Sequence, residues 1–376
     1  MRDVAIVGVG MIPFGRYPEM EAHEMGAKAT LDALKDAGTA LKDIQLLVCG
    51  QLFGTSGAGQ RMLKEIGQTG IPVVNTANAC ATGSTAFREG YFAIASEMYD
   101  AVLVVGQEKM GSGVMGGDEP PGGERPEGFV GSGTMPALFA MAGMEHMRKY
   151  GTTQEQFAKV AVKAKKHAAG NPYAKYRDPA TLDEVLNARM ISYPNTMLMC
   201  CPNTDGAAAA VLMPMAKARQ YTSQPIRVAA SILTSDPWTE RDLALLDINT
   251  LTRNAARQAY ETAGVGPEDL DLVELHDCFA TAELLHYENL GLCGDGEAGR
   301  FIDEEATYIG GRIPVNASGG LLSKGHPLGA TGVANIVEVT WHLRGQAGQR
   351  QVENAKVGLA HVIGIGAACT VHILKK

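Results

Sequence analysis

Hydrophobic and polar positions follow one order twice along the chain. Residues 26–53 and residues 252–279 each show helical spacing of apolar residues, then an Ala-Gly step, an acidic turn and an apolar run typical of a strand. Three pairs of landmarks keep the same offset of 226 residues, namely Gly38 and Gly264, Asp43 and Asp269, and Phe53 and Phe279. Three matches in one register are hard to obtain by chance, so the pattern predicts an internal repeat.

The repeat continues downstream with a different offset. Two Ala-Thr-Gly triplets, beginning at Ala81 and Ala330, lie 249 residues apart, and each opens a stretch with helical spacing. The predicted strands are residues 3–9, 71–74 and 100–106 in the first half and residues 226–234, 270–275 and 356–363 in the second. Strands that alternate with helices predict an α/β fold of two similar βαβαβ-type halves, with sheets covered by helices on both faces.

Residues 111–195 interrupt this pattern and are predicted to be an inserted loop domain. We therefore expect an N-terminal half of residues 1–110 plus 196–225 and a C-terminal half of residues 226–376. The insertion begins with a Gly- and Pro-rich stretch, residues 111–133, and continues with predicted helices over residues 136–150 and 153–168. The Gly-rich stretch is either a surface loop or a substrate lid, and both interpretations stay open.

Composition excludes several classes of protein. The chain has 376 residues with 45% hydrophobic side chains, which is enough for a large core. The formal net charge of −8 argues against non-specific binding of nucleic acid. No apolar run approaches the roughly 18 residues of a membrane span, and the first residues do not form a signal peptide.

Cysteine usage predicts free thiols in a cytoplasmic protein. There are seven cysteines, an odd number, and none forms a Cys-x-x-Cys pair, while Cys200 and Cys201 are adjacent, which is poor geometry for metal ligands. We therefore expect no structural zinc and no bound metal. A bound cofactor is not expected either, because Pro13 stands where a dinucleotide fingerprint would need its third glycine after Gly8 and Gly10.

Cys80 is the first candidate for chemistry. It stands between an apolar strand and the helix that opens at Ala81, so its sulfur would face the positive end of a helix dipole, which favours the thiolate. Small neighbours such as Ala79 and Gly83 leave room for a ligand. A buried core cysteine is the alternative interpretation.

His326 is the second candidate, because it lies in a loop rich in glycine and is followed by Pro327. This loop leads into the second half's equivalent of the Cys80 helix. The internal repeat therefore predicts that Cys80 and His326 face each other near a pseudo-twofold axis, as a Cys–His nucleophile pair requires. A histidine satisfied in a tight turn is the alternative.

Two further segments end predicted strands. The sequence His276-Asp277-Cys278-Phe279 follows the strand at residues 270–275, and the C-terminal ends of strands in α/β sheets collect functional sites. His276 and Cys278, two residues apart on an extended segment, would point into one pocket. Gly364-Ile365-Gly366 follows the last strand of the repeat and can offer a backbone N–H to an oxyanion. An ordinary polar strand end and an ordinary turn are the alternatives.

These segments together resemble the thiolase superfamily, and within it the sterol-carrier-protein (lipid-transfer) type. The motifs are NACATGSTA (78–86), NTDGAAAAVL (203–212), HDCFA (276–280), NASGGLLSKGHPLGATG (316–332) and GIG (364–366). The resemblance covers nearly the whole chain and implies a five-layered αβαβα fold. Conventional thiolases carry Asn-Glu-Ala-Phe where this chain has His276 to Phe279, and a Cys-x-Gly turn where it has Gly364 to Gly366. Cys369 is out of register with that turn and is expected in the core.

The resemblance implies a role for each matching residue. Cys80 would be the acyl-accepting nucleophile, with His326 as its base. His276 and His326 would stabilise the thioester oxyanion, and the backbone N–H groups of Cys80 and Gly366 would form a second oxyanion hole. Cys278 would be the acid/base at the substrate's α-carbon, in place of the late cysteine of conventional thiolases.

Substrate contacts are expected from Phe279, Ser318, Gly319 and Met144. Met144 belongs to a Met-rich part of the insertion. This stretch either surrounds a large apolar acyl group or packs against the core.

The implied activity is that of an acyl-CoA C-acyltransferase that cleaves a 3-oxoacyl-CoA with CoA, through an acyl-Cys80 intermediate and ping-pong kinetics. The alternatives are a biosynthetic acetoacetyl-CoA thiolase that works with a partner protein, and a non-catalytic subunit that binds acyl-CoA or lipid. Retention of Cys80, His276, Cys278 and His326 counts against the last. Relatives with aldolase activity lack the nucleophilic cysteine, so Cys80 also argues against that activity.

The resemblance implies partners as well. We expect a homodimer or a larger homo-oligomer. A small zinc-ribbon/OB-fold partner subunit is a further hypothesis, as in prokaryotic members of the subgroup. The expected enzyme stands alone, without a fused sterol-carrier domain or a peroxisomal tail.

Overall fold

The computed structural model describes residues 2–54, 56–111, 134–237, 248–364 and 368–376. Within them nine strands form one large mixed sheet in the order β3-β2-β4-β7-β1-β8-β11-β10-β9, and two further short strands pair separately. The strands of the first half are β1 (Val4–Met11), β2 (Leu46–Gly50), β3 (Val73–Thr76), β4 (Val102–Glu108) and β7 (Gly206–Pro214). Those of the second half are β8 (Ile226–Ser235), β9 (Leu272–Glu274), β10 (Val357–Gly364) and β11 (Ala368–Lys375).

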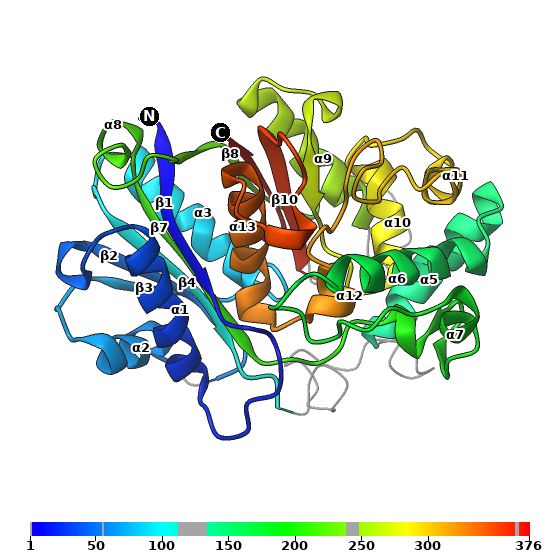
Figure 1. The fold of residues 1–376 in the computed structure, drawn as a ribbon, viewed down its shortest axis with the longest axis horizontal. Coiled ribbons are helices and arrows are strands. Elements are labelled where there is room, and N and C mark those ends of the chain that lie inside the picture. Colours follow the sequence, from blue (N-terminus) through cyan, green and yellow to red (C-terminus); the bar gives the residue numbers. More distant parts are fainter. Residues whose placement is uncertain (1, 55, 112–133, 238–247, 365–367) are drawn as a thin grey trace.

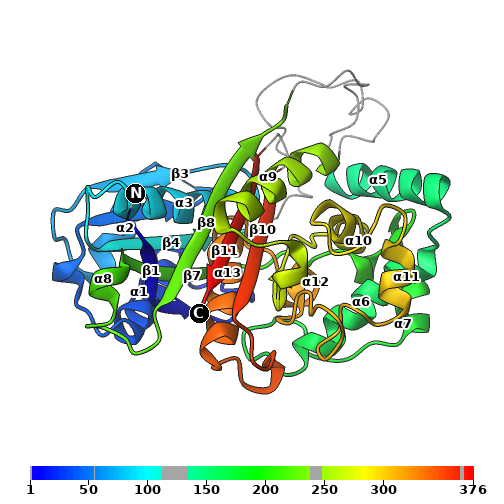
Figure 2. The same ribbon diagram turned by 90° about the horizontal axis from the view of Figure 1, so that it is seen from above.

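The two halves meet where β1 and β8 run antiparallel, with Val4 opposite Val228 and Ile6 opposite Ile226. Outward from this junction each half repeats one order: β1-β7-β4-β2-β3 on one side and β8-β11-β10-β9 on the other. In the second half, the position that corresponds to β3 holds a single parallel bridge, in which Val315 pairs with Val273 of β9. The internal repeat predicted from the sequence is therefore a repeat in space (Figures 1 and 2).

The structure adds a strand that the βαβαβ pattern did not include. β7 and β11 insert antiparallel beside β1 and β8, so each half has a mixed sheet rather than an all-parallel one. The residues of β7 are fully buried and rich in alanine. Because both faces of the strand are covered, it lacks the alternation of polar and apolar residues that marks a half-exposed strand.

Helices cover the sheet in the five layers that the sequence resemblance implied. The outer face of the first half carries α1 (Ala22–Asp36) and α2 (Ala58–Ile66), and the outer face of the second carries α9 (Ile248–Ala263) and α10 (Ala280–Asn289). Between the halves lie α3 (Thr82–Ala95) and α13 (Leu328–Arg344).

Side chains of the strands pack into a hydrophobic core on each face of the sheet. In β2, for example, Leu46 and Val48 pack into the central core around α13, whereas Leu47 and Cys49 pack beneath α1. Because successive side chains of a strand point to opposite faces of the sheet, each strand contributes residues to both cores.

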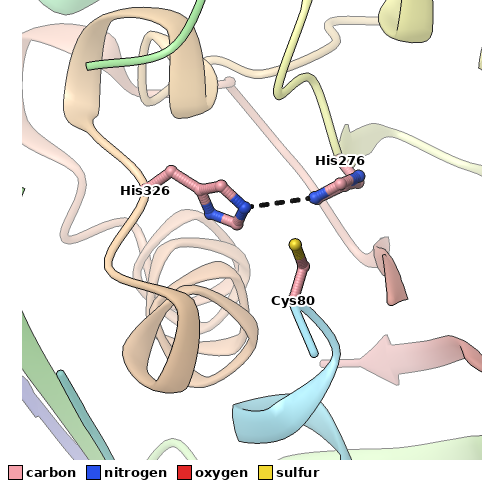
Figure 3. A group of neighbouring side chains, drawn as sticks. All are labelled: Cys80, His276 and His326. Carbon is pink, nitrogen blue, oxygen red and sulfur yellow. Dashed lines mark hydrogen bonds between the residues drawn. The ribbon is translucent and has the colours of Figure 1, made fainter. Parts of the chain in front are cut away.

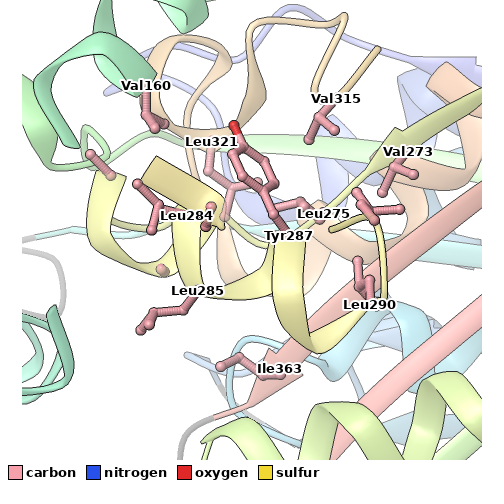
Figure 4. Packing of buried hydrophobic residues seen from close by; sticks show 14 of the residues in the cluster. Val160, Val273, Leu275, Leu284, Leu285, Tyr287, Leu290, Val315, Leu321 and Ile363 are labelled. Atoms are coloured by element: carbon pink, nitrogen blue, oxygen red, sulfur yellow. The ribbon is translucent and has the colours of Figure 1, made fainter. Parts of the chain in front are cut away.

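The part of the insertion that the structure describes packs on the second half. Its helices α5 (Met135–Tyr150) and α6 (Gln154–Ala168) match the two predicted helices, and Thr153 caps α6 by accepting a hydrogen bond from the N–H of Gln156. Both helices lie beside α10 and enclose a core that includes Phe157 and Tyr287 (Figure 4). The Gly-rich stretch of residues 112–133 lies outside the described residues.

The remaining elements are short. They are α7 (Leu182–Leu186), α8 (Met215–Ala218), α11 (Ala298–Asp303), α12 (Gly320–Lys324), the strands β5 (Met190–Ser192) and β6 (Asn195–Thr196), and 3-10 turns at Leu41–Asp43, Met197–Met199, Pro267–Asp269 and Gly348–Arg350. Two of these turns, Leu41–Asp43 and Pro267–Asp269, repeat at the offset of 226 residues found in the sequence.

Cys369 is fully buried in the core, as expected. Among the described helices, none has the length and apolar character to cross a membrane.

Candidate active site

Three side chains from distant parts of the chain converge between the halves (Figure 3). Cys80 stands just before α3, His276 follows β9, and His326 precedes α13. The Cys80 sulfur and one nitrogen of each imidazole all lie within 4.8 Å of one another. Both histidines are buried, whereas Cys80 is half-buried. A thiol, two imidazoles and access from outside therefore meet at one point.

Cys80 is held by a strained turn. Ala79, the residue before it, has φ of 46°, in the left-handed region that non-glycine residues rarely adopt. The Thr82 hydroxyl stabilises the turn by accepting from the Asn78 N–H at 2.8 Å and donating to the Ala79 carbonyl at 2.6 Å. Cys80 consequently lies two residues before a helix of 14 residues, at the positive end of its dipole.

The end of β10 lies against this same turn. A Cβ on Gly364 would be 2.3 Å from the Asn78 carbonyl oxygen, so only glycine permits the approach. Gly366, expected to donate its N–H to an oxyanion, lies outside the described residues.

Hydrogen bonds define the tautomer of His326. Its Nδ1 is 2.8 Å from the Thr331 hydroxyl, and that hydroxyl donates its own proton to the Pro327 carbonyl at 3.0 Å. Since the Thr331 oxygen must then accept, His326 carries its proton on Nδ1 and presents the lone pair of Nε2. Burial lowers the pKa of His326 to about 3, so the ring is neutral near pH 7. His326 can therefore accept a proton from Cys80.

His276 has the complementary arrangement. Its Nε2 is 3.4 Å from the Nε2 of His326. Because that atom of His326 offers a lone pair, the proton of His276 belongs on Nε2, where it can be donated. Burial, together with the nearby His326, His361 and His286 rings, lowers the pKa of His276 well below its usual value. The pair thus offers one N–H donor and one acceptor to the space beside Cys80.

Two carboxylates that flank His276 hold the loop that leads to His326. Glu274 accepts from the backbone N–H of Ser318 at 3.0 Å and from its hydroxyl at 2.6 Å. Asp277 accepts from the N–H groups of Leu321 at 2.7 Å and Leu322 at 3.3 Å, at the start of α12. The segments that carry the two histidines are therefore joined by four hydrogen bonds.

A buried ion network extends this support. The Lys324 ammonium is fully buried, 3.9 Å from the carboxylate of Glu274 and 4.0 Å from that of Glu338. Arg350 pairs with Glu338 at 2.8 Å. Two positive and two negative groups balance in the interior, and loss of one would leave an uncompensated buried charge.

Cys278 lies beside Cys201, a cysteine that no sequence motif marked as catalytic. The N–H of Cys201 donates to the Cys278 carbonyl at 3.0 Å, within a short antiparallel bridge that pairs Cys200 with Phe279. Burial, with further contributions from Cys201 and Cys80, raises the pKa of the Cys278 thiol well above its usual value. Cys278 is thus a protonated thiol near Cys80.

The expected substrate contacts are placed differently from the three converging side chains. Ser318 is fully buried and engaged with Glu274, and a Cβ on Gly319 would meet Ala168 at 2.5 Å. The Phe279 ring packs against Phe139 with 5.1 Å between ring centroids. Met144 lies on α5 with its side chain 41% exposed.

Sequence reasoning does not identify Thr331, Asp277 and Glu274 as individual contributors. In the sequence Thr331 stands out only as part of the second Ala-Thr-Gly triplet, and Asp277 only as a neighbour of His276. Their spacing from the histidines is a signal, but the contacts depend on how the loops fold.

Comparison with known proteins agrees with this geometry. Residues 4–185 match the family model of the thiolase N-terminal domain, and residues 239–376 match that of the thiolase C-terminal domain-like family. The chain belongs to the thiolase family. It is an acyltransferase of that family, and the resemblance drawn from the motifs is confirmed.

Relatives in this family span the full chain. Sterol carrier protein 2 of Bos taurus is 41% identical over 99% of this chain and 72% of its own length. An acetyl-CoA acetyltransferase of Methanothermobacter thermautotrophicus is 40% identical over all of both chains. Benzoylsuccinyl-CoA thiolase subunit BbsB of Thauera aromatica is 36% identical over 97% of this chain and 95% of its own.

A solved structure of an Ltp2-ChsH2(DUF35) aldolase has the same fold. It superposes with a TM-score of 0.85 at 25% identity and covers 99% of this chain and 97% of its own.

Proposed function

We propose that this thiolase-family enzyme cleaves a 3-oxoacyl-CoA with CoA through an acyl-Cys80 intermediate. His326 takes the thiol proton, and the Cys80 sulfur attacks the 3-oxo carbon. The bond between C2 and C3 then breaks, which leaves the acyl group on Cys80 and releases the two carbons attached to CoA as the enolate of acetyl-CoA. The tautomer of His326, fixed by Thr331, is the observation that carries this proposal, since it presents a lone pair beside Cys80.

Two donors are assigned to the enolate oxygen. His276 carries its proton on Nε2, and His326 gains one on Nε2 when Cys80 is deprotonated. Both N–H groups then point to the space between them, as an oxyanion hole requires. The backbone N–H groups of Cys80 and Gly366 would serve the tetrahedral intermediate on Cys80.

Cys278 is assigned the proton transfer at carbon. Its raised pKa keeps the thiol protonated, so it can give a proton to C2 of the enolate. The resulting thiolate can take the proton of the incoming CoA thiol, which attacks acyl-Cys80 and releases the new acyl-CoA. Protons and leaving groups balance over the two half-reactions, and ping-pong kinetics follow.

The reverse reaction is the second candidate. The same groups would join two acetyl units into acetoacetyl-CoA, and similarity to an acetyl-CoA acetyltransferase favours this interpretation. An aldolase reaction, suggested by the name of the structural neighbour, does not require a cysteine nucleophile, and Cys80 speaks against it. A non-catalytic acyl-CoA or lipid-binding subunit requires neither Cys80 nor a base beside it.

Partners are proposed on two grounds. The name of the structural neighbour includes a DUF35 protein, and BbsB is named as a subunit, which supports a heteromeric complex with a small partner. β3 is the outermost strand of the sheet, with Val74 43% exposed, and an uncovered edge strand can pair with a second copy of the chain. A homodimer is therefore part of the proposal.

Intact-protein mass spectrometry tests the intermediate. Wild type and Cys80→Ser are incubated briefly with acetyl-CoA, acetoacetyl-CoA and bulkier 3-oxoacyl-CoAs, and Cys293→Ser is the matched control because Cys293 lies apart from the site. We expect one acyl group on wild type and on Cys293→Ser, and none on Cys80→Ser. Acylation of Cys80→Ser, or no adduct on wild type with any acyl-CoA even after addition of candidate partners, would overturn the proposal.

A further inference from the structure

We propose that Cys80, His276 and His326 also bind one thiophilic divalent cation, of which Zn²⁺ is the type, as an exchangeable inhibitor. The ion would be a reversible ligand of the apoenzyme and not a resident cofactor, which agrees with the absence of any metal-binding motif in the sequence. Binding to the free site does not depend on the reaction catalysed there, whereas the inhibition rests on the proposed function of Cys80.

The spacing of the ligand atoms fits a tetrahedral ion. The two Nε2 atoms are 3.4 Å apart. Two imidazole nitrogens, each about 2.0–2.1 Å from zinc at a tetrahedral angle, are separated by about 3.3 Å. The Cys80 sulfur lies within 4.8 Å of both nitrogens, so an inward movement of roughly 1 Å would complete a three-ligand site. A solvent molecule would take the fourth position, since Cys80 is half-buried and not sealed.

The surroundings of the histidines favour a metal. Thr331 accepts the Nδ1 proton of His326, which is the kind of outer contact that orients a metal-bound imidazole and leaves Nε2 free to coordinate. His276 must move its proton from Nε2 to Nδ1. No acceptor among the described residues lies within hydrogen-bond distance of that Nδ1, so the shift gives up the contact with His326 and leaves a buried N–H unpaired, and metal coordination must offset both costs.

The ligand set selects the class of cation. One thiolate and two imidazoles suit Zn²⁺, Co²⁺ and Cd²⁺, whereas Mg²⁺ and Ca²⁺ prefer oxygen ligands. Binding displaces the Cys80 proton and occupies the sulfur lone pair that would attack a substrate. The cation and an acyl group therefore compete for the same sulfur atom, and a chelator should reverse the inhibition.

Equilibrium dialysis and absorption spectroscopy test the site. Protein stripped with a chelator and kept reduced with a phosphine is dialysed against Zn²⁺, with Mg²⁺ as the control cation. Co²⁺ titration then reports a sulfur-to-cobalt charge-transfer band. We expect one Zn²⁺ per chain, a cobalt–thiolate band and no binding of Mg²⁺.

Variants assign the ligands. Cys80→Ser and His276→Asn should each weaken Zn²⁺ binding at least about 10-fold, and Thr331→Val should weaken it about 10- to 100-fold through His326. Cys293→Ser is the matched thiol control and should bind as wild type does. Alkylation of wild-type Cys80 gives a second measurement that does not depend on a substitution, and it should abolish the cobalt band.

Separate readouts distinguish this proposal from the proposed function. Zn²⁺ binding of equal strength in Cys80→Ser and wild type, or a Co²⁺ spectrum without a thiolate band, would overturn the metal site even if Cys80 is acylated. Conversely, failure of acylation combined with a Cys80-dependent Zn²⁺ site would overturn the proposed function and leave the metal site intact.

Discussion

Gly83 in α3 and Gly332 in α13 each lie against the backbone of the other helix. A Cβ on Gly83 would be 2.4 Å from the Gly329 carbonyl oxygen, and a Cβ on Gly332 would be 2.3 Å from the Ser84 nitrogen. These glycines end the two Ala-Thr-Gly triplets of the internal repeat. The triplets therefore mark the point where the central helices of the two halves cross, next to Cys80 and His326.

Gly332→Ala should push α3 and α13 apart where the two helices cross. The added methyl group meets backbone, which cannot rotate away, so we expect a loss of about 1–3 kcal/mol in the free energy of unfolding. We also expect slower acylation of Cys80, since the start of α13 follows the His326 loop. Denaturant unfolding and timed mass spectrometry measure the two effects. Gly15→Ala is the control, because its new Cβ would have no neighbour closer than 3.7 Å. Equal stability of the two variants would contradict the prediction.

Thr331→Val should disturb the base without touching the nucleophile. Valine keeps the shape of threonine but removes the oxygen that accepts the Nδ1 proton of His326. We expect Cys80 acylation to slow about 10-fold or more, since general-base catalysis contributes roughly 100-fold or more. Thr331→Ser should restore the rate. Nitrogen NMR of labelled histidine reports the tautomer of His326 directly, and an unchanged Nδ1–H tautomer in Thr331→Val would refute the assignment.

Asp277→Asn should weaken the link between the two histidine segments. The amide keeps one acceptor, but its NH₂ group would face the N–H of Leu321 or Leu322. A buried donor facing a donor costs about 1–3 kcal/mol. Chemical denaturation measures the loss. The control is Asp269→Asn, whose partner, the Gly266 N–H, lies on the exposed surface. We expect Asp277→Asn to lose more stability than Asp269→Asn. A larger loss in Asp269→Asn would show that Asp277 does not hold α12.

The free energy of unfolding should already decrease at mildly acidic pH. Burial is the main reason that the pKa is lowered in seven histidines, namely His167, His276, His286, His326, His342, His361 and His372. The unfolded chain, with histidine pKa values near 6.5, binds protons before the folded one does.

Stability should therefore fall as the pH drops below about 6.5, by about 1.4 kcal/mol per pH unit for each such histidine, until the pH reaches the lowered pKa of that histidine in the folded state. Unfolding free energies between pH 8 and pH 5 check the sign. His372→Phe should reduce the slope, and a stability that is flat below pH 6.5 would contradict the prediction.

Val74→Lys should favour the monomer. A lysine on the uncovered edge of β3 would place like charges together if two copies pair along this strand. Light scattering after size-exclusion chromatography should give a dimer for wild type and a shift towards the monomer for the variant. Met98→Lys, which changes another exposed apolar residue, is the control. A dimer that withstands Val74→Lys would locate the interface elsewhere.

The amino-acid sequence by itself determined the repeat, most of the strands and the longer helices α1, α3, α5, α6, α9 and α13. Periodicity of apolar residues is local, so α5, α6 and the paired landmarks such as Gly38 and Gly264 could be predicted from spacing alone. The motifs around Cys80, His276 and His326 also marked the chemistry, because small residues and glycines gather where backbone must approach closely.

Only the tertiary structure decided which atoms meet. β7 and β11 enter each sheet antiparallel, a pairing that depends on residues far away in the chain. The proton of His326 is assigned by Thr331, and the loop that carries His326 is held by Glu274 and Asp277, more than 40 residues away in the sequence. Ser318, expected at the substrate, donates both its N–H and its hydroxyl to Glu274 and so helps to hold that loop. Side-chain partners of this kind follow from long-range packing, whose distances no local pattern of residues encodes.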